Sequence, residues 1–304
     1  MKRVVISTSS FGKISRHPLD LLADAGCEVI LNPHGRKLTP AESRELLADA
    51  DGLIAGTERL DREILAAAPR LRIISRVGTG LDSVDLDAAE ELGIKVLNTP
   101  DAHVPAVAEL TLAGMLAVLR QIAFADRRVR AGQWTKPMGR LLFGKRVGIV
   151  GMGRVGRYLR GLLQPFMVEL LAHDLEPDPS LEDVRWVGLA ELLERSEVVT
   201  LHVSGGRLLD ADAIASMLPG AVLVNVARGG VVDEAALAEA LSSGHLAGAH
   251  LDVFEDEPYE GPLTDLDNVL LTSHIGSYAA ECRVAMELEA TEKVIAHFAA
   301  GGAG

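Results

Sequence analysis

The chain has 304 residues, of which 48% are hydrophobic and 24% charged, a composition typical of a globular protein with room for two domains. Its formal net charge of −13 repels polyanions and argues against a nucleic-acid-binding or anionic-membrane surface. The segment Met1–Ser7 lacks the long apolar stretch and cleavage site of a signal peptide, so we expect a cytoplasmic protein.

The first hundred residues alternate short β-branched segments with amphipathic helical ones. The predicted strands are 3–7, 28–32, 52–55, 72–77 and 95–98, and the predicted helices are 18–25, 40–50, 61–68 and 85–92. Alternation of this kind predicts crossover connections and a parallel sheet that is covered on both faces. Cys27 and Cys282 belong to no motif with metal-ligand spacing, so we expect neither a disulfide framework nor a metal site.

A long segment of helix-forming residues runs from Pro105 to Arg130 and is apolar on more than one flank. Charged residues such as Glu109, Arg120 and Asp126 interrupt it, which favours burial within a domain or a dimer over a membrane span. After a connector at 132–144, a second βα series follows. Its predicted strands are 146–150, 168–173, 198–203, 222–226, 249–253 and 269–272. The sequence therefore predicts an α/β protein of two doubly wound parallel-sheet domains.

A glycine-rich turn begins the second series, where Gly151-Met152-Gly153-Arg154-Val155-Gly156 follows an apolar strand and opens a helix. In such a turn the first glycine permits the bend, the second lets the backbone approach a pyrophosphate, and the third lets helix and strand pack closely. The helix N-terminus adds unpaired N–H groups and the positive end of its dipole. Asp174 ends the next strand, 18 residues beyond Gly156, where a carboxylate binds ribose hydroxyls and repels a 2′-phosphate. The pattern predicts NAD rather than NADP.

Three chemically suited side chains follow predicted strands of the second series. Arg228 precedes two glycines, and a guanidinium there can bind a carboxylate and a carbonyl oxygen together. Glu257 lies in Asp252-Val253-Phe254-Glu255-Asp256-Glu257-Pro258, and His274 lies in Ser273-His274-Ile275-Gly276. A carboxylate partner orients an imidazole and favours its protonated form, which suits a proton donor near neutral pH. Reduction of a 2-keto acid needs a group that binds the carboxylate, a group that polarises the carbonyl and an acid that donates a proton.

With these motifs in this order, the sequence resembles the D-isomer-specific 2-hydroxyacid dehydrogenase family, and especially its D-3-phosphoglycerate dehydrogenase-like members. The resemblance covers almost the whole chain. It includes the segments 76–85, 107–110, 144–156 and 225–234, in addition to those containing Glu257 and His274.

This resemblance implies catalytic roles for Arg228 as substrate-binding group, His274 as acid/base and Glu257 as its partner. It implies that Arg76 and the backbone of Val77 and Gly78 bind substrate, and that His202, Ala227 and Asp252 contact NAD. It further implies a flavodoxin-like substrate domain (1–100 plus 276–304), a Rossmann NAD domain (101–275), and a homodimer formed through the 105–130 helix. A non-catalytic NAD-sensing regulator of the same fold is the alternative function.

Two departures from the family pattern bear on the substrate. The loop 204–207 is about four residues shorter than usual, and Gly56 stands where some phosphoglycerate enzymes have an arginine, which weakens phosphoglycerate as the substrate. An anionic substrate tail could instead meet Arg76, the segment Thr8–Ser10, or Arg36 and Lys37. The chain ends after the helix predicted at 284–300, so we expect no additional regulatory domain.

Overall fold

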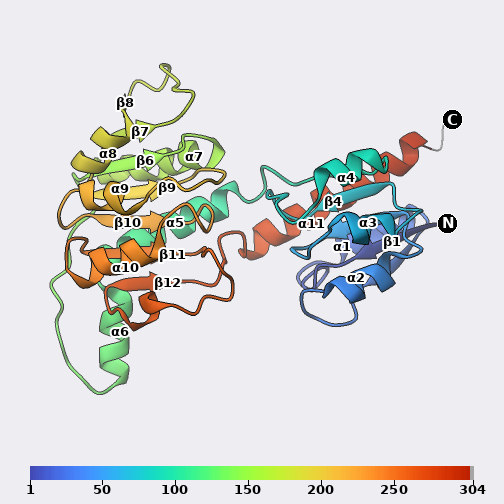
Figure 1. The fold of residues 1–304 in the computed structure, drawn as a ribbon, viewed down its shortest axis with the longest axis horizontal. Helices are drawn as coiled ribbons and strands as arrows, with labels where there is room; N and C mark the ends of the chain where they lie inside the picture. Colours follow the sequence, from blue (N-terminus) through green and yellow to red (C-terminus); the bar gives the residue numbers. More distant parts are fainter. Residues whose placement is uncertain (302–304) are drawn as a thin grey trace. The chain divides into compact units, whose positions relative to one another are not determined.

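The computed structural model describes residues 1–301, in which two units each consist of a parallel sheet and its helices (Figure 1). Unit 1 comprises Met1–His103 and the C-terminal segment from Ser277, and unit 2 comprises Val104–Gly276. All pairings between named strands are parallel, as expected when each strand is followed by a helical crossover. The predicted α/β class with two doubly wound sheets is confirmed.

The sheet of unit 1 has the order β2-β1-β3-β4-β5. Its strands are β1 (Lys2–Ile6), β2 (Cys27–Leu31), β3 (Gly52–Ala55), β4 (Ile73–Arg76) and β5 (Lys95–Leu97). Its helices are α1 (His17–Asp24), α2 (Pro40–Leu47), α3 (Arg62–Ala66), α4 (Leu86–Glu91) and α11 (Ala280–Gly301). Alternate strand residues face opposite sides of the sheet, so Val5, Leu53 and Ile74 join the core formed with α2, α3 and α4. The C-terminal helix α11 contacts β3 and β4.

The sheet of unit 2 has the order β12-β11-β10-β9-β6-β7-β8. Its strands are β6 (Arg146–Val150), β7 (Glu169–His173), β8 (Val184–Trp186), β9 (Val198–Leu201), β10 (Val222–Asn225), β11 (Gly248–Leu251) and β12 (Val269–Leu271). Its helices are α5 (Val104–Leu119), α6 (Ile122–Arg130), α7 (Arg154–Leu163), α8 (Leu189–Arg195), α9 (Ala211–Ser216) and α10 (Glu234–Ser242), with 3₁₀ turns η1 (Gln164–Phe166) and η2 (Pro262–Asp265).

Two apolar clusters cover the two faces of this sheet. Ile149 packs with residues of α5 and α7, whereas its neighbour Val150 packs with residues of α8, α9 and α10. Strands buried on both faces explain the nearly continuous apolar sequences of β6, β9 and β10. The short edge strand β8 was not predicted from the sequence.

The segment expected as one helix from 105 to 130 forms two helices, α5 and α6, which are bent by 63°. The break lies at Gln121, which adopts a left-handed conformation with φ of 53°. The carbonyl of Leu119 accepts the backbone N–H of Arg140 at 2.8 Å, so the returning connector satisfies the end of α5. Among the residues described, no single helix is long and apolar enough to cross a membrane.

Helix α5 approaches β11 through Gly114. A Cβ atom at this position would lie 1.9 Å from Nδ1 of His250, a side chain with 0% exposure. Burial lowers the pKa of His250 to about 4, so the ring is neutral at pH 7 and packs against the helix.

We therefore expect Gly114→Ala to lower the free energy of unfolding by about 1–3 kcal/mol, because the close-packed helix and strand cannot both stay in place. Gly161→Ala in α7 is the matched control, since a Cβ there meets no atom within 4 Å and alanine favours the helix by roughly 0.5–1 kcal/mol. Urea denaturation of the two variants measures both effects. Equal stability of the two variants would contradict this packing.

Candidate active site

The glycine-rich turn joins β6 to α7. Gly151 has φ of +93°, and a Cβ there would lie 2.5 Å from the carbonyl oxygen of His202. A Cβ on Gly156 would lie 2.3 Å from the Gly151 carbonyl oxygen, whereas one on Gly153 would meet open space. Gly153 is the N-cap of α7, and no side chain among the described residues caps it. An open, uncapped helix N-terminus behind a glycine turn fits a pyrophosphate.

Asp174 lies at the end of β7, beside this turn. Its Oδ2 accepts the backbone N–H of Met152 at 2.6 Å, and its Oδ1 accepts that of Glu176 at 3.1 Å. The carboxylate is therefore fixed against the glycine turn, where the neighbouring Arg154 and Val155 begin α7. This position suits the recognition of ribose hydroxyls that the sequence predicts.

His202 and Ala227 follow the neighbouring strands β9 and β10. The backbone N–H of His202 donates to the Val150 carbonyl at 2.7 Å, and its Nε2 lies 3.0 Å from Thr200 Oγ1. Burial lowers the pKa of the His202 ring to about 4, so at pH 7 the ring is neutral. The backbone N–H of Ala227 donates to Asn225 Oδ1 at 3.1 Å. Both residues lie at the carboxyl edge of the sheet, on the β9 side of the β6/β9 switch point where open α/β sheets bind ligands.

Arg228 comes next after β10 and is half-buried. Its Nη1 donates to the carbonyl of Ala227 at 2.8 Å, and Asn225 Nδ2 donates to the carbonyl of Arg228 at 3.1 Å. The short loop is thus tied to the last residue of the strand, which fixes the start of the arginine side chain at the sheet edge.

His274 and Glu257 are brought together by the structure. Nδ1 of His274 lies 3.0 Å and 2.9 Å from the two carboxylate oxygens of Glu257, and the backbone N–H of Phe254 donates to Glu257 Oε1 at 3.2 Å. The two side chains are 51% and 39% exposed. With Nδ1–H donating to the carboxylate, Nε2 is the ring nitrogen left for a ligand.

Asp252 supports the loop that carries His274. Its side chain is 1% exposed, and Oδ1 accepts Thr272 Oγ1–H at 2.6 Å and the backbone N–H of Ile275 at 2.8 Å. Oδ2 accepts the backbone N–H of Gly276 at 2.8 Å. His274 itself has a left-handed φ of 55°, which is unusual for a residue with a Cβ. The carboxylate that we expected to contact NAD thus holds the histidine loop. No sequence signal pointed to Thr272, because its contact with Asp252 joins two strands.

In unit 1, the segment Arg76–Gly78 follows β4. The backbone N–H of Val77 donates to the Ala55 carbonyl at 3.0 Å, and that of Gly78 donates to Thr99 Oγ1 at 2.8 Å. The guanidinium of Arg76 donates to the carbonyl of Val77. Because two of the expected anion-binding N–H groups are already used, further donors in this loop must come from residues after Gly78.

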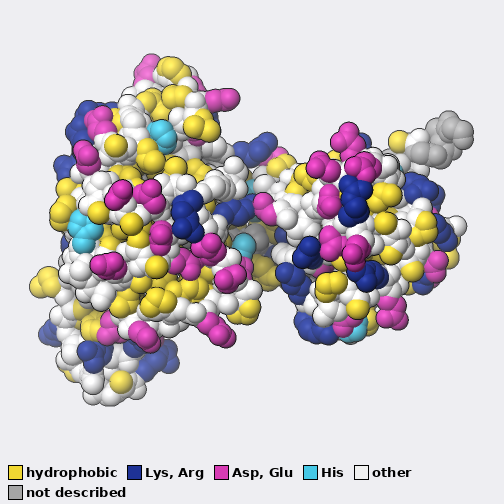
Figure 2. Space-filling view, viewed as in Figure 1, with side chains coloured by type: hydrophobic (Ala, Val, Ile, Leu, Met, Phe, Trp, Pro, Cys, Tyr) yellow, Lys and Arg dark blue, Asp and Glu magenta, His cyan; other side chains and the backbone are white. Residues whose placement is uncertain are grey.

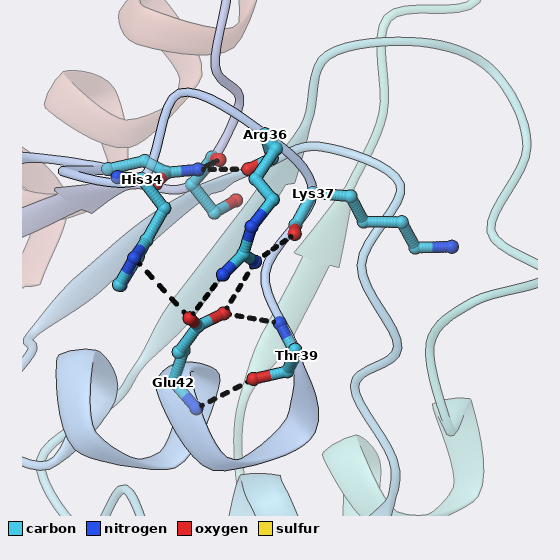
Figure 3. A network of polar contacts seen from close by, with 7 residues as sticks. His34, Arg36, Lys37, Thr39 and Glu42 are labelled. Carbon is cyan, nitrogen blue, oxygen red and sulfur yellow. Dashed lines mark hydrogen bonds and ion pairs between the residues drawn. The ribbon is translucent and has the colours of Figure 1, made fainter.

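Arg36 and Lys37, the other basic residues considered for an anionic tail, lie at the start of α2 (Figure 3). Arg36 donates to both carboxylate oxygens of Glu42, at 2.9 Å and 2.7 Å, and its hydrogen bond holds the pKa of Glu42 well below the usual range. Glu42 also accepts the backbone N–H of Thr39 at 2.8 Å, in a capping box. Arg36 therefore stabilises the helix start, and the Lys37 side chain points away from this network in Figure 3.

Residues 112–276, which contain the turn and the His274–Glu257 pair, match the family model "D-isomer specific 2-hydroxyacid dehydrogenase, NAD binding domain". The chain belongs to the D-isomer specific 2-hydroxyacid dehydrogenase family. This match identifies unit 2 as the NAD-binding domain of a family member, in agreement with the expected cofactor.

Relatives within this family differ in their names and lengths. The chain is 40% identical to a glyoxylate reductase of Thermofilum pendens over 290 residues, covering 89% of this chain and 85% of that protein. It is 39% identical to a D-3-phosphoglycerate dehydrogenase of Mycobacterium leprae over 257 residues, covering 81% of this chain and 49% of that protein. The chain thus spans about half the length of the phosphoglycerate dehydrogenases that it matches. The TT0316 protein of Thermus thermophilus superposes with a TM-score of 0.88 at 37% identity, over 95% of this chain and 94% of that chain.

We expect Asp174→Ala to narrow the preference of this NAD-binding domain for NADH over NADPH. The ratio of the two dissociation constants should change by about tenfold or more, because hydrogen bonds from the ribose to a charged acceptor are lost. Glu176→Ala is the matched control, because it removes a carboxylate two residues away that does not contact Met152. The dissociation constants of both nucleotides, measured by fluorescence titration, give the ratio. An unchanged ratio in Asp174→Ala would contradict the assignment.

Proposed function

We propose that this chain is an NAD-dependent oxidoreductase that transfers a hydride between nicotinamide and a D-2-hydroxy acid or the corresponding 2-oxo acid. The observation that carries the proposal is the contact of both Glu257 oxygens with Nδ1 of His274, at 3.0 Å and 2.9 Å. Arg228 follows β10 and His274 follows β12, and these two strands flank β11 in one parallel sheet. The loops that carry Arg228 and His274 therefore emerge at the same edge of the sheet. The relatives carry the names of enzymes, which supports catalysis over the regulatory alternative.

Each residue has a defined task in this reaction. The Arg228 guanidinium binds the substrate carboxylate and polarises its carbonyl oxygen. Protonated His274 donates the proton on Nε2 to that oxygen as the alcohol forms, and it takes the proton back in the oxidation. Glu257 orients the ring and balances its positive charge. NAD, when bound, supplies or accepts the hydride.

Oxidation of NADH in the presence of 2-oxo acids tests this function. We expect His274→Ala to lower turnover by on the order of 10² or more, because the proton donor is lost, while NADH still binds. His34→Ala is the control, since its ring contacts Glu42 in unit 1 and has no part in the reaction. Near-normal turnover in His274→Ala would rule out its role, and failure of the native chain to reduce glyoxylate, hydroxypyruvate and phosphohydroxypyruvate would rule out the function.

We also propose that two copies of the chain associate through α6 and the connector that follows it. Large apolar side chains along this segment are exposed: Ile122 (54%), Val129 (50%), Trp134 (83%), Met138 (88%), Leu141 (66%) and Phe143 (61%). Several large exposed apolar side chains within one short segment are typical of a surface that a partner covers. A second copy is the partner that the sequence predicts. Acidic side chains are spread over the face shown in Figure 2 and the net charge is −13, so two copies associate most favourably through an apolar segment.

Sedimentation of the native chain at micromolar concentration should give twice the monomer mass. The double substitution Trp134→Glu and Met138→Lys should give monomers, because it places charges in the proposed contact. Leu31→Lys is the control, since Leu31 is also exposed, at 48%, but lies on edge strand β2 of unit 1. A native chain that sediments as a monomer would contradict the dimer.

A further inference from the structure

A histidine lies inside the sheet of unit 2, in a strand whose other residues are apolar or glycine. His250 belongs to β11 and is 0% exposed. Its Nδ1 faces Gly114 of α5, and among residues 1–301 this nitrogen has no hydrogen-bond partner. A buried nitrogen without a partner costs free energy that an apolar residue at this position would avoid. What the imidazole contributes must therefore come from its other nitrogen, Nε2.

Nε2 of His250 begins a chain of hydrogen bonds. It lies 3.1 Å from Thr272 Oγ1, and the Thr272 hydroxyl donates to Asp252 Oδ1 at 2.6 Å. The parallel pairing of β11 with β12 places His250 beside Leu270, and Asp252 and Thr272 each come two residues later. Because alternate residues along a strand face the same side, the polar groups of His250, Thr272 and Asp252 meet on one face of the sheet.

The single proton of the Thr272 hydroxyl fixes the direction of this chain. A carboxylate accepts hydrogen bonds, so the hydroxyl donates to Asp252 and its oxygen must accept from His250. Nε2 of His250 therefore carries the ring proton, and Nδ1 is the unprotonated nitrogen beside Gly114. Burial lowers the pKa of His250 to about 4, although the nearby Asp252 carboxylate acts in the opposite direction, so the ring is neutral at pH 7.

Asp252 connects this chain to the loop of His274. Its two carboxylate oxygens accept the N–H groups of Ile275 and Gly276, each at 2.8 Å, and its backbone carbonyl accepts the N–H of His274 at 2.8 Å. Members of a hydrogen-bond chain polarise one another, so an N–H donor behind the Thr272 hydroxyl strengthens its bond to Asp252. Loss of that donor loosens the carboxylate that holds the loop.

We propose that His250 is a positioning residue for the reduction of the 2-oxo acid, because its Nε2–H donates to Thr272 and so fixes, through Asp252, the loop that carries His274. The inference rests on the proposed function, in which His274 donates the proton. Since His250 is 0% exposed, it acts through other residues. A misplaced proton donor slows the chemical step more than it weakens binding, so the effect appears in kcat rather than in KM.

The direction of the hydrogen bonds can be measured in the native chain without an assay of activity. ¹⁵N NMR of the histidine-labelled protein at pH 7 should show His250 protonated on Nε2 and unprotonated on Nδ1, with the signals assigned by their loss in His250→Gln. The opposite tautomer would overturn the inference, because Thr272 could not then accept from the ring while it donates to Asp252.

Two substitutions at position 250 test the role in turnover. His250→Leu removes the donor and should lower kcat for the 2-oxo acid that the native chain reduces fastest by about five- to tenfold, the size expected when one buried hydrogen bond between uncharged groups is lost, with KM within about twofold. His250→Gln supplies an amide N–H near the position of Nε2 and should recover most of kcat.

His245→Leu is the matched control, because this ring of unit 2 bonds through Nε2 to the Ile214 carbonyl at 3.2 Å, away from the chain of His250. Its kcat should stay within about twofold of the native value. Should His250→Leu not fold, the tautomer and the turnover of His250→Gln decide the role in the same way.

Removal of His274 separates positioning from a general effect on the fold. In the His274→Ala background, His250→Leu should lower the residual turnover by less than about twofold, because no imidazole remains to be positioned. A full five- to tenfold loss in that background, a native kcat in His250→Leu, or equal losses in His250→Leu and His250→Gln would overturn the inference and leave the proposed function intact. A native chain that reduces none of the three acids named above would remove both.

Discussion

The hydrogen bonds to the buried carboxylate of Asp252 are the interaction on which the His274 loop of unit 2 depends. Three donors from the β12 exit, Thr272 Oγ1–H and the N–H groups of Ile275 and Gly276, converge on its two oxygens. They hold the loop in a conformation in which His274 has a left-handed φ. A buried carboxylate that accepts several hydrogen bonds is costly to disturb, so Asp252 fixes the backbone of the loop that carries His274. Glu257 then orients the ring through Nδ1.

Hydrogen bonds between a carboxylate and loop backbone groups also fix the edge of the unit 2 sheet where we expect the cofactor. Asp174 binds the Met152 N–H, so the group expected to recognise ribose is joined to the turn expected to hold pyrophosphate. Gly151 lies directly against the His202 carbonyl, which brings the exits of β6 and β9 into contact. Side chains for binding therefore lie on short loops whose backbones are fixed to one another, and such rigid support favours precise positioning of ligands.

Local sequence patterns predicted much of this architecture. The glycine turn, the parallel sheets and the loops of Arg228, Glu257 and His274 follow from strand endings and residue types within short segments. The break between α5 and α6 could not be predicted, because it depends on the Arg140 N–H reaching back to Leu119 from a distant connector. The contacts of Asp252 could not be predicted for the same reason, since its donors come from residues that follow another strand. Contacts distant in sequence decide what a polar residue does.

The family comparison bears on the choice of substrate. The chain is similar to relatives named for different acids, glyoxylate and 3-phosphoglycerate, at nearly equal identity, so overall similarity does not distinguish between these substrates. Discrimination between such acids depends on the group at the third carbon, and a hydroxyl and a phosphate differ mainly in charge and hydrogen bonding.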